Sequence, residues 1–330
     1  MKRSTPGLKL VQAVSGFVQY KAAEALSPRT LESYQDHLDR WQEYIGDIDV
    51  SRVSTQQVRA FLAWLRAEYK PRRLTGGDQP LSPKTIRNFW VTLSAFYRWA
   101  SGEFGFPNPM TAVPAPKFED APVEPFAREE IEKLLKAVEY CREAKTDHRQ
   151  AFTMRRSSGN RDRAIILTLL DTGLRASELC SLTIGDVDQK NGRVLIKHGA
   201  LGGAKGGKGR TVYLGKAARR SLWRHLAERD DADDPQAPLF LGRLNRRFNK
   251  NVLRQLIARL GEKAGVAKCH PHRFRHTFAI TYLRSGGDVF TLQSLLGHST
   301  LEMVQHYARL AQIDVEQAHR KASPADNWRL

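Results

Sequence analysis

The sequence predicts a mainly α-helical fold with one small β-sheet, an α+β chain divided into two domains. Apolar residues recur at helical spacing over much of the 330 residues, which is typical of amphipathic helices. Two β-branched runs flank a glycine-rich segment between 192 and 215, a pattern that predicts a hairpin. Prolines crowd the stretch 106–126 and resist helix and sheet interiors. This stretch is predicted to link a domain at 1–105 to a domain at 127–312, and 313–330 form a C-terminal tail.

Three helices are predicted before the linker. The segments 26–45 and 81–100 begin with LSPRT and LSPKT, in which serine suits the N-cap and proline suits the first helical position. A third helix is predicted at 54–69, with Ser54 or Thr55 as its cap and apolar residues on one face. Together these three segments predict a small helical bundle.

The second domain is predicted to be mostly helical. A helix at 127–139 precedes a polar, basic stretch at 140–160 and a buried helix at 163–173. The hairpin strands GRVLIKHG and GRTVYLG follow. The remaining helices are predicted at 216–229, 244–264, 272–285, 289–296 and 300–310. The capping box STLE at 299–302 is expected to start the last of them.

The charge of the chain favours a polyanionic partner. Fifty-three Lys and Arg against 35 Asp and Glu give a net charge of +18, which points to nucleic acid first and to an anionic membrane second, or to a basic protein with no such partner. A signal-peptide core is missing from the N-terminal stretch, and no apolar run approaches the roughly 18 residues of a membrane span. Three scattered cysteines do not make a disulfide framework, so a cytoplasmic location is expected.

Residues 270–276 read HPHRFRH, and three chemical interpretations compete for this stretch. A metal site lacks ligand partners, because no acidic residue lies between 263 and 287 and the arginines repel a cation. In a helix, His272, Arg275 and His276 share one face and can converge on an oxyanion. The same face can also pair with buried carboxylates, so the heptapeptide alone leaves the choice between these two open.

Four motifs in a fixed order connect this stretch to a known family. They are TGLRASEL at 172–179, GAKGGKGR at 203–210, HRFRHTFA at 272–279 and LLGHSTLEMVQHY at 295–307. Together they resemble the tyrosine recombinases, or phage-integrase family, which share a catalytic fold with type IB topoisomerases. The resemblance implies a helical, SAM-like core-binding domain joined to a catalytic domain, in an architecture that clamps DNA.

The resemblance also implies a metal-free and ATP-free transesterification. A DNA phosphodiester cut without metal needs fixed cations, a nucleophile and a leaving-group acid. The family pattern assigns the phosphate clamp to Arg175 and Arg275 and the nucleophile to Tyr307. It assigns a hydrogen bond to the phosphate to His298. The base is then His272, and the acid is Lys205. Lys208 is the alternative acid, because the hairpin tip is glycine-rich. Attack yields a 3′-phosphotyrosine and a free 5′-hydroxyl, and strand exchange passes through a Holliday junction. No cofactor is expected.

Supporting and DNA-binding positions follow from the same comparison. Glu178 is expected to orient the site, and His276 to support it structurally. Contacts with DNA are expected from Lys208, Arg210, Arg29, Lys84 and Arg87. The side chains of His270, Arg273 and His306 are predicted to lie at the surface or on the DNA backbone. The basic stretch 140–160 is either a surface loop or a further backbone contact.

The predicted partner is double-stranded DNA at core recombination sites. A recombinase of this family acts as four protomers on two duplexes, so a homotetramer on DNA and a monomer in solution are expected. The tail 313–330 is expected to dock either on a neighbouring protomer or on the protomer to which it belongs. A type IB topoisomerase and a non-catalytic, sequence-specific DNA binder are the rival functions. The expected setting is the nucleoid of a prokaryotic cell, for a gene of prokaryotic, phage or mobile-element origin.

Overall fold

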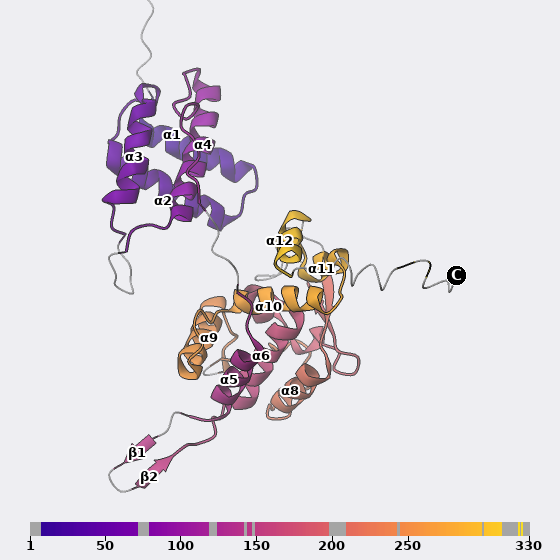
Figure 1. Cartoon of the computed structure of the whole chain (residues 1–330). Coiled ribbons are helices and arrows are strands. Elements are labelled where there is room, and N and C mark those ends of the chain that lie inside the picture. The colour runs from indigo at the N-terminus through magenta and orange to yellow at the C-terminus, as the bar shows by residue number, and fades with distance from the viewer. Residues whose placement is uncertain are drawn as a thin grey trace, which may run out of the picture. The chain divides into compact units, whose positions relative to one another are not determined.

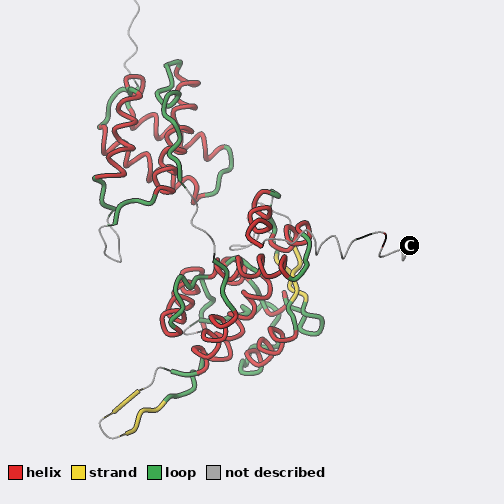
Figure 2. Tube along the Cα trace, in the orientation of Figure 1, coloured by secondary structure: helices red, strands yellow, loops and turns green. Residues whose placement is uncertain are grey.

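The chain, described here by a computed structural model, forms two compact units, Met1–Pro122 and Val123–Leu330. The structure describes residues 8–71, 79–118, 124–141, 144–146, 149–197, 209–242, 245–298 and 300–311, together with 323 and 325. Figure 2 shows that both units are built mainly of helices, with the described strands confined to short hairpins. The prediction of a mainly α fold with a small sheet is confirmed. None of the described helices is long and apolar enough to cross a membrane.

The first unit is a bundle of four described α-helices (Figure 1). They are α1 (Leu10–Ala23), α2 (Pro28–Ile45), α3 (Thr55–Ala67) and α4 (Pro83–Phe104), with a 3₁₀ turn at Val50–Arg52. Helix α1 is not among the helices predicted from the sequence. Its buried residues, Leu10, Ala13, Val14 and Phe17, nevertheless follow helical spacing.

The predicted caps of the bundle are confirmed. Ser27, Ser54 and Ser82 each accept a hydrogen bond from the backbone N–H three residues later, as N-cap serines do. In the core, the buried indole of Trp41 donates to the hydroxyl of Tyr97 across 2.9 Å, so the largest side chain of α2 is satisfied as well as packed.

The second unit contains eight described α-helices and two described hairpins. The helices are α5 (Arg128–Glu139), α6 (Gly159–Thr172), α7 (Ala176–Ser181), α8 (Lys216–Leu226), α9 (Lys250–Ala264), α10 (Pro271–Arg284), α11 (Val289–Leu296) and α12 (Glu302–Ala311). A 3₁₀ turn covers Ile184–Asp186. Helix α6 packs against α5, α8 and α10. It lies at the centre of the unit, because apolar side chains surround it on several sides: Ala164, Ile165, Ile166 and Leu169 are all fully buried.

The predicted hairpin is present as β3 (Arg193–Ile196) and β4 (Arg210–Tyr213). The strands are antiparallel, and Arg193 pairs with Tyr213 while Ile196 pairs with Arg210. The glycine-rich tip, with both Lys205 and Lys208, lies outside the described residues.

The basic stretch 140–160, expected to be either a surface loop or a further DNA-backbone contact, has secondary structure that was not predicted. It contains a second hairpin, β1 (Ala144–Thr146) with β2 (Arg149–Phe152). Its base is joined by backbone hydrogen bonds from Cys141 to Met154 and from Arg156 to Glu139. This pairing arises from contacts between the two arms of the stretch, and such contacts leave little trace in the composition of either arm.

Three predicted helix starts are wrong, and the first is that of α6, which begins at Gly159 and not at 163. Helix α9 begins at Lys250 and not at 244, because the Asn249 side chain accepts from the N–H groups of Asn251 and Val252 and so caps the helix there. Helix α12 begins at Glu302, with the Leu301 carbonyl as acceptor for Val304 and Gln305. The helix therefore starts later than the capping box STLE predicts.

Candidate active site

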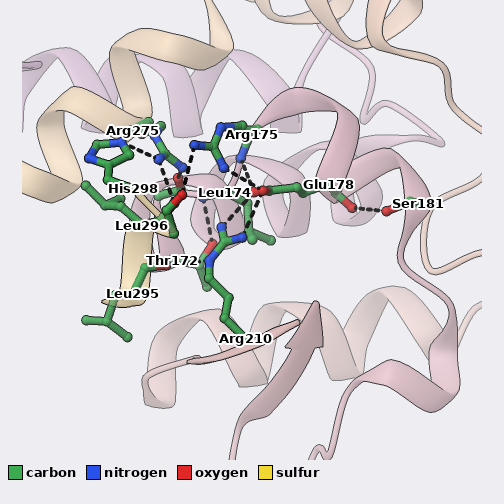
Figure 3. Close-up of polar contacts among 12 residues, drawn as sticks. Thr172, Leu174, Arg175, Glu178, Ser181, Arg210, Arg275, Leu295, Leu296 and His298 are labelled. Carbon is green, nitrogen blue, oxygen red and sulfur yellow. Dashed lines mark hydrogen bonds and ion pairs between the residues drawn. The ribbon is translucent and has the colours of Figure 1, made fainter. Parts of the chain in front are cut away.

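The candidate site is assembled where three distant segments meet (Figure 3). Gly173 ends α6 in the left-handed conformation, with φ of +61°, and the chain turns there into α7, whose N-cap is Arg175. The other two segments are the first half of α10 and the turn after α11. Glycine is required at 173, because an added Cβ would lie 2.5 Å from the Phe278 ring.

Glu178 is the centre of the polar network. Its carboxylate has no exposed surface and accepts hydrogen bonds from the backbone N–H of Arg175 at 2.8 Å and from the Arg175 Nη1 at 2.9 Å. Arg210 donates to both oxygens, at 2.9 Å and 2.7 Å. Burial alone would raise the pKa of Glu178, but the hydrogen bonds and charges of Arg210 and then Arg175 outweigh it and bring the pKa to about 2.

Arg210 does not fit its predicted role as a DNA contact. Only 8% of its side chain is exposed, because its donors are taken by Glu178 and by the Leu295 carbonyl, which accepts from Nε at 2.7 Å. Figure 3 shows this guanidinium against Glu178 from the side opposite Arg175. The sequence placed Arg210 beside a basic loop tip, and nothing local indicated the buried carboxylate that it pairs with.

Arg275 is fixed by backbone carbonyls. It is 1% exposed, and it donates from Nη1 to Gly173 O at 2.9 Å and from Nη2 to Leu296 O at 2.7 Å. Burial, and then the charge of Arg175, lower the pKa of Arg275 to about 10, so it stays protonated at neutral pH. Arg175 reaches the same turn through Nη2, 3.3 Å from Gly297 O. The two guanidiniums thus converge from different helices.

His298 lies on the other side of Arg275. Its Nε2 is 2.7 Å from Nη2 of Arg275. Because a guanidinium only donates, Nε2 accepts and Nδ1 carries the proton. Burial, followed by the charges of Arg275 and Arg175, lowers the pKa of His298 to about 4, and the ring is neutral at pH 7. Among the described residues, the buried Nδ1 has no hydrogen-bond partner.

Tyr307 reaches the same cluster from α12. It is 4% exposed and packs among apolar side chains of α10 and α11, and its hydroxyl lies 2.8 Å from Nδ1 of His276. Burial raises the pKa of Tyr307, while the positive charges of Arg275 and Arg175 act in the opposite direction. The structure therefore brings together Arg175, Arg275, His298 and Tyr307, four of the predicted catalytic residues.

His272 is placed differently from His276. It stays exposed, and its ring centre lies 4.3 Å from that of His276 in an edge-to-face contact. Partial desolvation, and then the charge of Arg275, lower the pKa of His272 to about 4. It borders a cleft of about 570 Å³ whose charged and imidazole lining residues are Arg175, Lys250, Arg254, His270 and His272. This cleft offers an anion a cationic wall next to the two guanidiniums.

Two further residues of the HPHRFRH stretch have structural roles: His270 lies at the surface, as predicted, whereas Arg273 is buried, contrary to its prediction. His270 is the N-cap of α10, and its Nδ1 accepts from the N–H of Arg273 at 3.1 Å. Arg273 is 8% exposed, and its guanidinium donates to Glu130 and to the carbonyls of Glu124 and Ala267. It fastens α10 to α5 and to the segment before it. The side chain of His306 lies outside the described residues.

The predicted DNA contacts of the first unit lie at helix starts. Arg29 is exposed in the first turn of α2, and Lys84 is exposed at the start of α4. The ammonium of Lys84 lies 5.5 Å from the centre of the Phe118 ring. Arg87 is half-buried, and it donates to the Pro116 carbonyl at 3.1 Å. Their contact with DNA stays a prediction.

Comparison with protein-family models identifies both parts of the chain. Residues 125–313 match the phage integrase family, and residues 14–104 match the phage integrase N-terminal SAM-like domain. The described residues contain no group of three or more His, Cys, Asp or Glu placed to hold a metal ion.

Curated relatives match over nearly the whole chain. The tyrosine recombinase XerA of Thermococcus kodakarensis is 30% identical, over 94% of this chain and 95% of its own length. The tyrosine recombinase XerC of Xanthomonas campestris is 31% identical, over 91% of this chain and 84% of its own length.

Solved structures share the fold. The Tn1549 transposon integrase in complex with a circular intermediate DNA superposes with a TM-score of 0.70 at 19% identity, covering 91% of this chain and 95% of that one. A lambda integrase dimer bound to a COC′ core site gives a TM-score of 0.68 at 17% identity, over 91% of this chain and 77% of that one.

Proposed function

We propose, since the chain belongs to the phage integrase family and is a tyrosine-type site-specific recombinase, that Tyr307 attacks a phosphodiester of double-stranded DNA and forms a 3′-phosphotyrosine link. The observation that carries this proposal is the convergence of Arg175, Arg275 and His298 beside the Tyr307 side chain. These residues come from four segments, and Arg175 lies far from the other three in the sequence. The function depends on this arrangement more than on any single motif.

The two arginines are assigned to the phosphate. As Tyr307 attacks, negative charge develops on the non-bridging oxygens, and cations already in position stabilise it without reorganisation. Arg275 is held by two carbonyls, and Arg175 is held by Glu178, so both guanidiniums are positioned before DNA arrives. Guanidinium also suits this task because it stays charged and donates from a planar fork.

His298 is assigned a hydrogen bond to the phosphate. A neutral imidazole with its proton on Nδ1 has one donor to offer, and this buried donor has no partner among the described residues. A phosphate oxygen would supply the missing acceptor. The leaving 5′-oxygen takes its proton from Lys205, with Lys208 as the alternative, and we propose both from the family pattern alone.

Rejoining reverses the same step. The phosphotyrosine keeps the energy of the broken phosphodiester, so attack by a new 5′-hydroxyl restores the strand without ATP or a metal cofactor. Two such rounds exchange both strands, and the Holliday junction is the intermediate between them.

The proposed assembly is a homotetramer on two duplexes, formed from monomers. Each chain would bind DNA through both of its units, with Arg29, Lys84 and Arg87 of the first unit on the DNA backbone. The tail 313–330 is proposed to dock on a neighbouring protomer. Solved relatives described as DNA complexes support the DNA partner, among them a XerH site-specific recombinase bound to palindromic difH. The proposed setting is the bacterial or archaeal nucleoid.

A nicked suicide duplex taken from the DNA that flanks the gene tests the reaction. The expected result is a covalent protein–DNA adduct on a denaturing gel that disappears in Tyr307→Phe. If no adduct forms on a cognate site, the chain is a DNA binder without this chemistry. Exchange between two sites, as opposed to relaxation of one supercoiled circle, separates a recombinase from a type IB topoisomerase.

Truncation after residue 312 tests the docking of the tail. The truncated chain is expected to form adduct on one site and to fail to assemble tetramers on two sites, as measured by native gel or mass photometry. Intact tetramers would show that the tail is not the link between protomers.

A further inference from the structure

We propose that His276, and not His272, takes the proton from Tyr307 when the phenol attacks DNA. This inference rests on the proposed function, in which Tyr307 is the nucleophile. It reassigns the base, because the family resemblance selects His272 and gives His276 only structural support. Direct contact with the reacting atom would make His276 a catalytic residue.

The first support is contact. Nδ1 of His276 lies 2.8 Å from the Tyr307 hydroxyl, within the reach that a general base needs for the proton that it abstracts. Within the described part of the chain, His272 makes no hydrogen bond to Tyr307. Its ring instead lies against the edge or face of His276 and borders the cationic cleft.

The second support is the environment of the pair. Tyr307 is nearly fully buried, so bulk water has little access to its proton. A phenol with an ordinary pKa near 10 is ionised in about one molecule in a thousand at pH 7, and burial shifts Tyr307 further toward the neutral form. A nucleophile in this state needs an adjacent acceptor.

The charged surroundings favour a proton transfer inside the pair. The titratable and charged groups around it are His272 and Arg275 on α10, His298 after α11 and Arg175 before α7. The two guanidiniums stabilise the developing phenolate. His298 is not the acceptor, because its Nε2 already accepts from Arg275.

Two protons move when Tyr307 attacks the DNA. The Tyr307 oxygen forms a bond to phosphorus, its proton moves to Nδ1 of His276, and the bond from phosphorus to the 5′-oxygen breaks. That oxygen takes a proton from the general acid, proposed to be Lys205. On rejoining, the imidazolium of His276 returns the proton to the leaving phenolate, as microscopic reversibility requires.

This reassignment of the base leaves His272 with a different role. It lies on the exposed side of His276, at the rim of the cleft that Arg175 and Arg254 line. A neutral imidazole there donates a hydrogen bond to the DNA and keeps the His276 ring in place through the edge-to-face contact. Loss of His272 is therefore expected to weaken the reaction without removing the base.

The test compares His276→Asn with His272→Asn as the matched control. The Asn side chain keeps an acceptor near the position of Nδ1 but cannot accept the proton. Single-turnover adduct formation on a suicide duplex is expected to fall about 100-fold or more in His276→Asn at neutral pH. Its rate should then keep rising with pH, because hydroxide replaces the base, whereas His272→Asn keeps the inflection of the parent.

A more acidic phenol separates a lost base from a disturbed structure. When a fluorinated tyrosine replaces Tyr307, the deficit of His276→Asn should shrink at least tenfold, because a phenol that ionises more readily needs less help. The deficit of His272→Asn should stay the same. A 5′-thiolate leaving group, which needs no acid, should rescue Lys205→Ala and leave His276→Asn slow.

Three results would overturn the assignment: a His276→Asn rate within threefold of the parent, an unchanged pH profile, or equal fluorotyrosine rescue of both variants. Absence of adduct from the parent chain on a cognate site would instead refute the proposed function. Duplex affinity in a Tyr307→Phe background, expected to match the parent in His276→Asn, excludes a binding defect as the cause of that variant's slow rate.

Discussion

Two arginine-rich regions of the second unit use the same side chain in opposite ways. In the candidate site, Arg175, Arg210 and Arg275 are held by Glu178 and by carbonyls of the chain. On α8, the cations Lys216, Arg220 and Arg224 stand four residues apart in one row. Within the described part of the chain, none of these three makes a hydrogen bond or an ion pair. The α8 row borders a groove of about 540 Å³ that Arg163 of α6 also lines.

The difference shows what fixes a cation. In the site, a carboxylate is buried completely, and its cost is offset by two guanidiniums that it orients. The α8 row has no such partner, so its members keep their water and their rotamer freedom, and they repel one another weakly. In the proposed reaction, two of the fixed cations, Arg175 and Arg275, act on one phosphate in the transition state. Solvated cations contribute only to the general field around the protein.

The largest effect that would test the difference between fixed and solvated cations is expected at Arg275. Arg275→Lys keeps the charge and loses the two-pronged attachment to Gly173 and Leu296, so adduct formation is expected to fall about 100-fold to 1,000-fold. The measurement is single-turnover cleavage of a suicide duplex, with and without a chelator, and the chelator should leave the parent active. Wild-type activity in Arg275→Lys would mean that charge alone suffices and that orientation adds nothing.

Glu178→Gln tests the carboxylate that orients the site. Removing its charge leaves two guanidiniums unpaired, and the free energy of unfolding is expected to fall by about 3–5 kcal/mol. Urea unfolding at pH 7 measures this, with the exposed Glu132→Gln as control. A loss equal to that of the control would show that the network is not a stabilising element.

The stability difference between the parent and Glu178→Gln should also depend on pH. The pKa of Glu178 is about 2 in the folded chain against an ordinary 4.5, so the carboxylate contributes about 3 kcal/mol that is fully present above pH 4.5. This contribution is lost as the pH falls toward 2. The gap in stability between the parent and Glu178→Gln should therefore narrow below pH 4.5, which unfolding curves between pH 3 and 7 record.

Arg210→Ala and Arg220→Ala compare the two regions directly. Arg210 does not reach the phosphate in this assignment, but it holds Glu178, so its loss is expected to slow adduct formation roughly tenfold to a hundredfold. Arg220 belongs to the α8 row, and its loss should leave the rate unchanged. Equal effects from both substitutions would erase the distinction drawn between fixed and solvated cations.

The smallest effect is expected within the α8 row, where a substitution should raise the stability of the protein and not lower it. Arg220 stands between Lys216 and Arg224, one turn from each, so Arg220→Gln removes two like-charge contacts and should raise the stability by about 0.2–0.5 kcal/mol for each. The gain should vanish in 1 M salt, where charges are screened within about 3 Å. A stability decrease at low salt would indicate that the row has an acceptor after all.

Local signals in the sequence predicted much of this molecule. Ser27, Ser54 and Ser82 cap helices at the predicted residues because a cap depends only on its own next turn. The β3–β4 hairpin was likewise predicted from its two flanking runs. Arg175, Arg275, His298 and Tyr307 were found by family resemblance, and the structure brings them together.

Features that depend on distant partners were not predictable in this way. Arg210 looks like any basic residue beside a loop until Glu178 is seen against it. His276 differs from His272 only through the position of α12, which carries Tyr307. The β1–β2 hairpin depends likewise on pairing geometry that a linear pattern does not record.

Gly173 has a consequence for the genetics of this protein. It touches no DNA in the proposed reaction, yet its carbonyl orients Arg275 and the space for its side chain is filled by Phe278. Even alanine would displace that ring and strain the left-handed turn. Random mutagenesis should therefore yield inactive alleles at codon 173, and second-site revertants should trim Phe278. Such a suppressor pair would reveal by genetics the contact between residue 173 and Phe278, which the substrate does not touch.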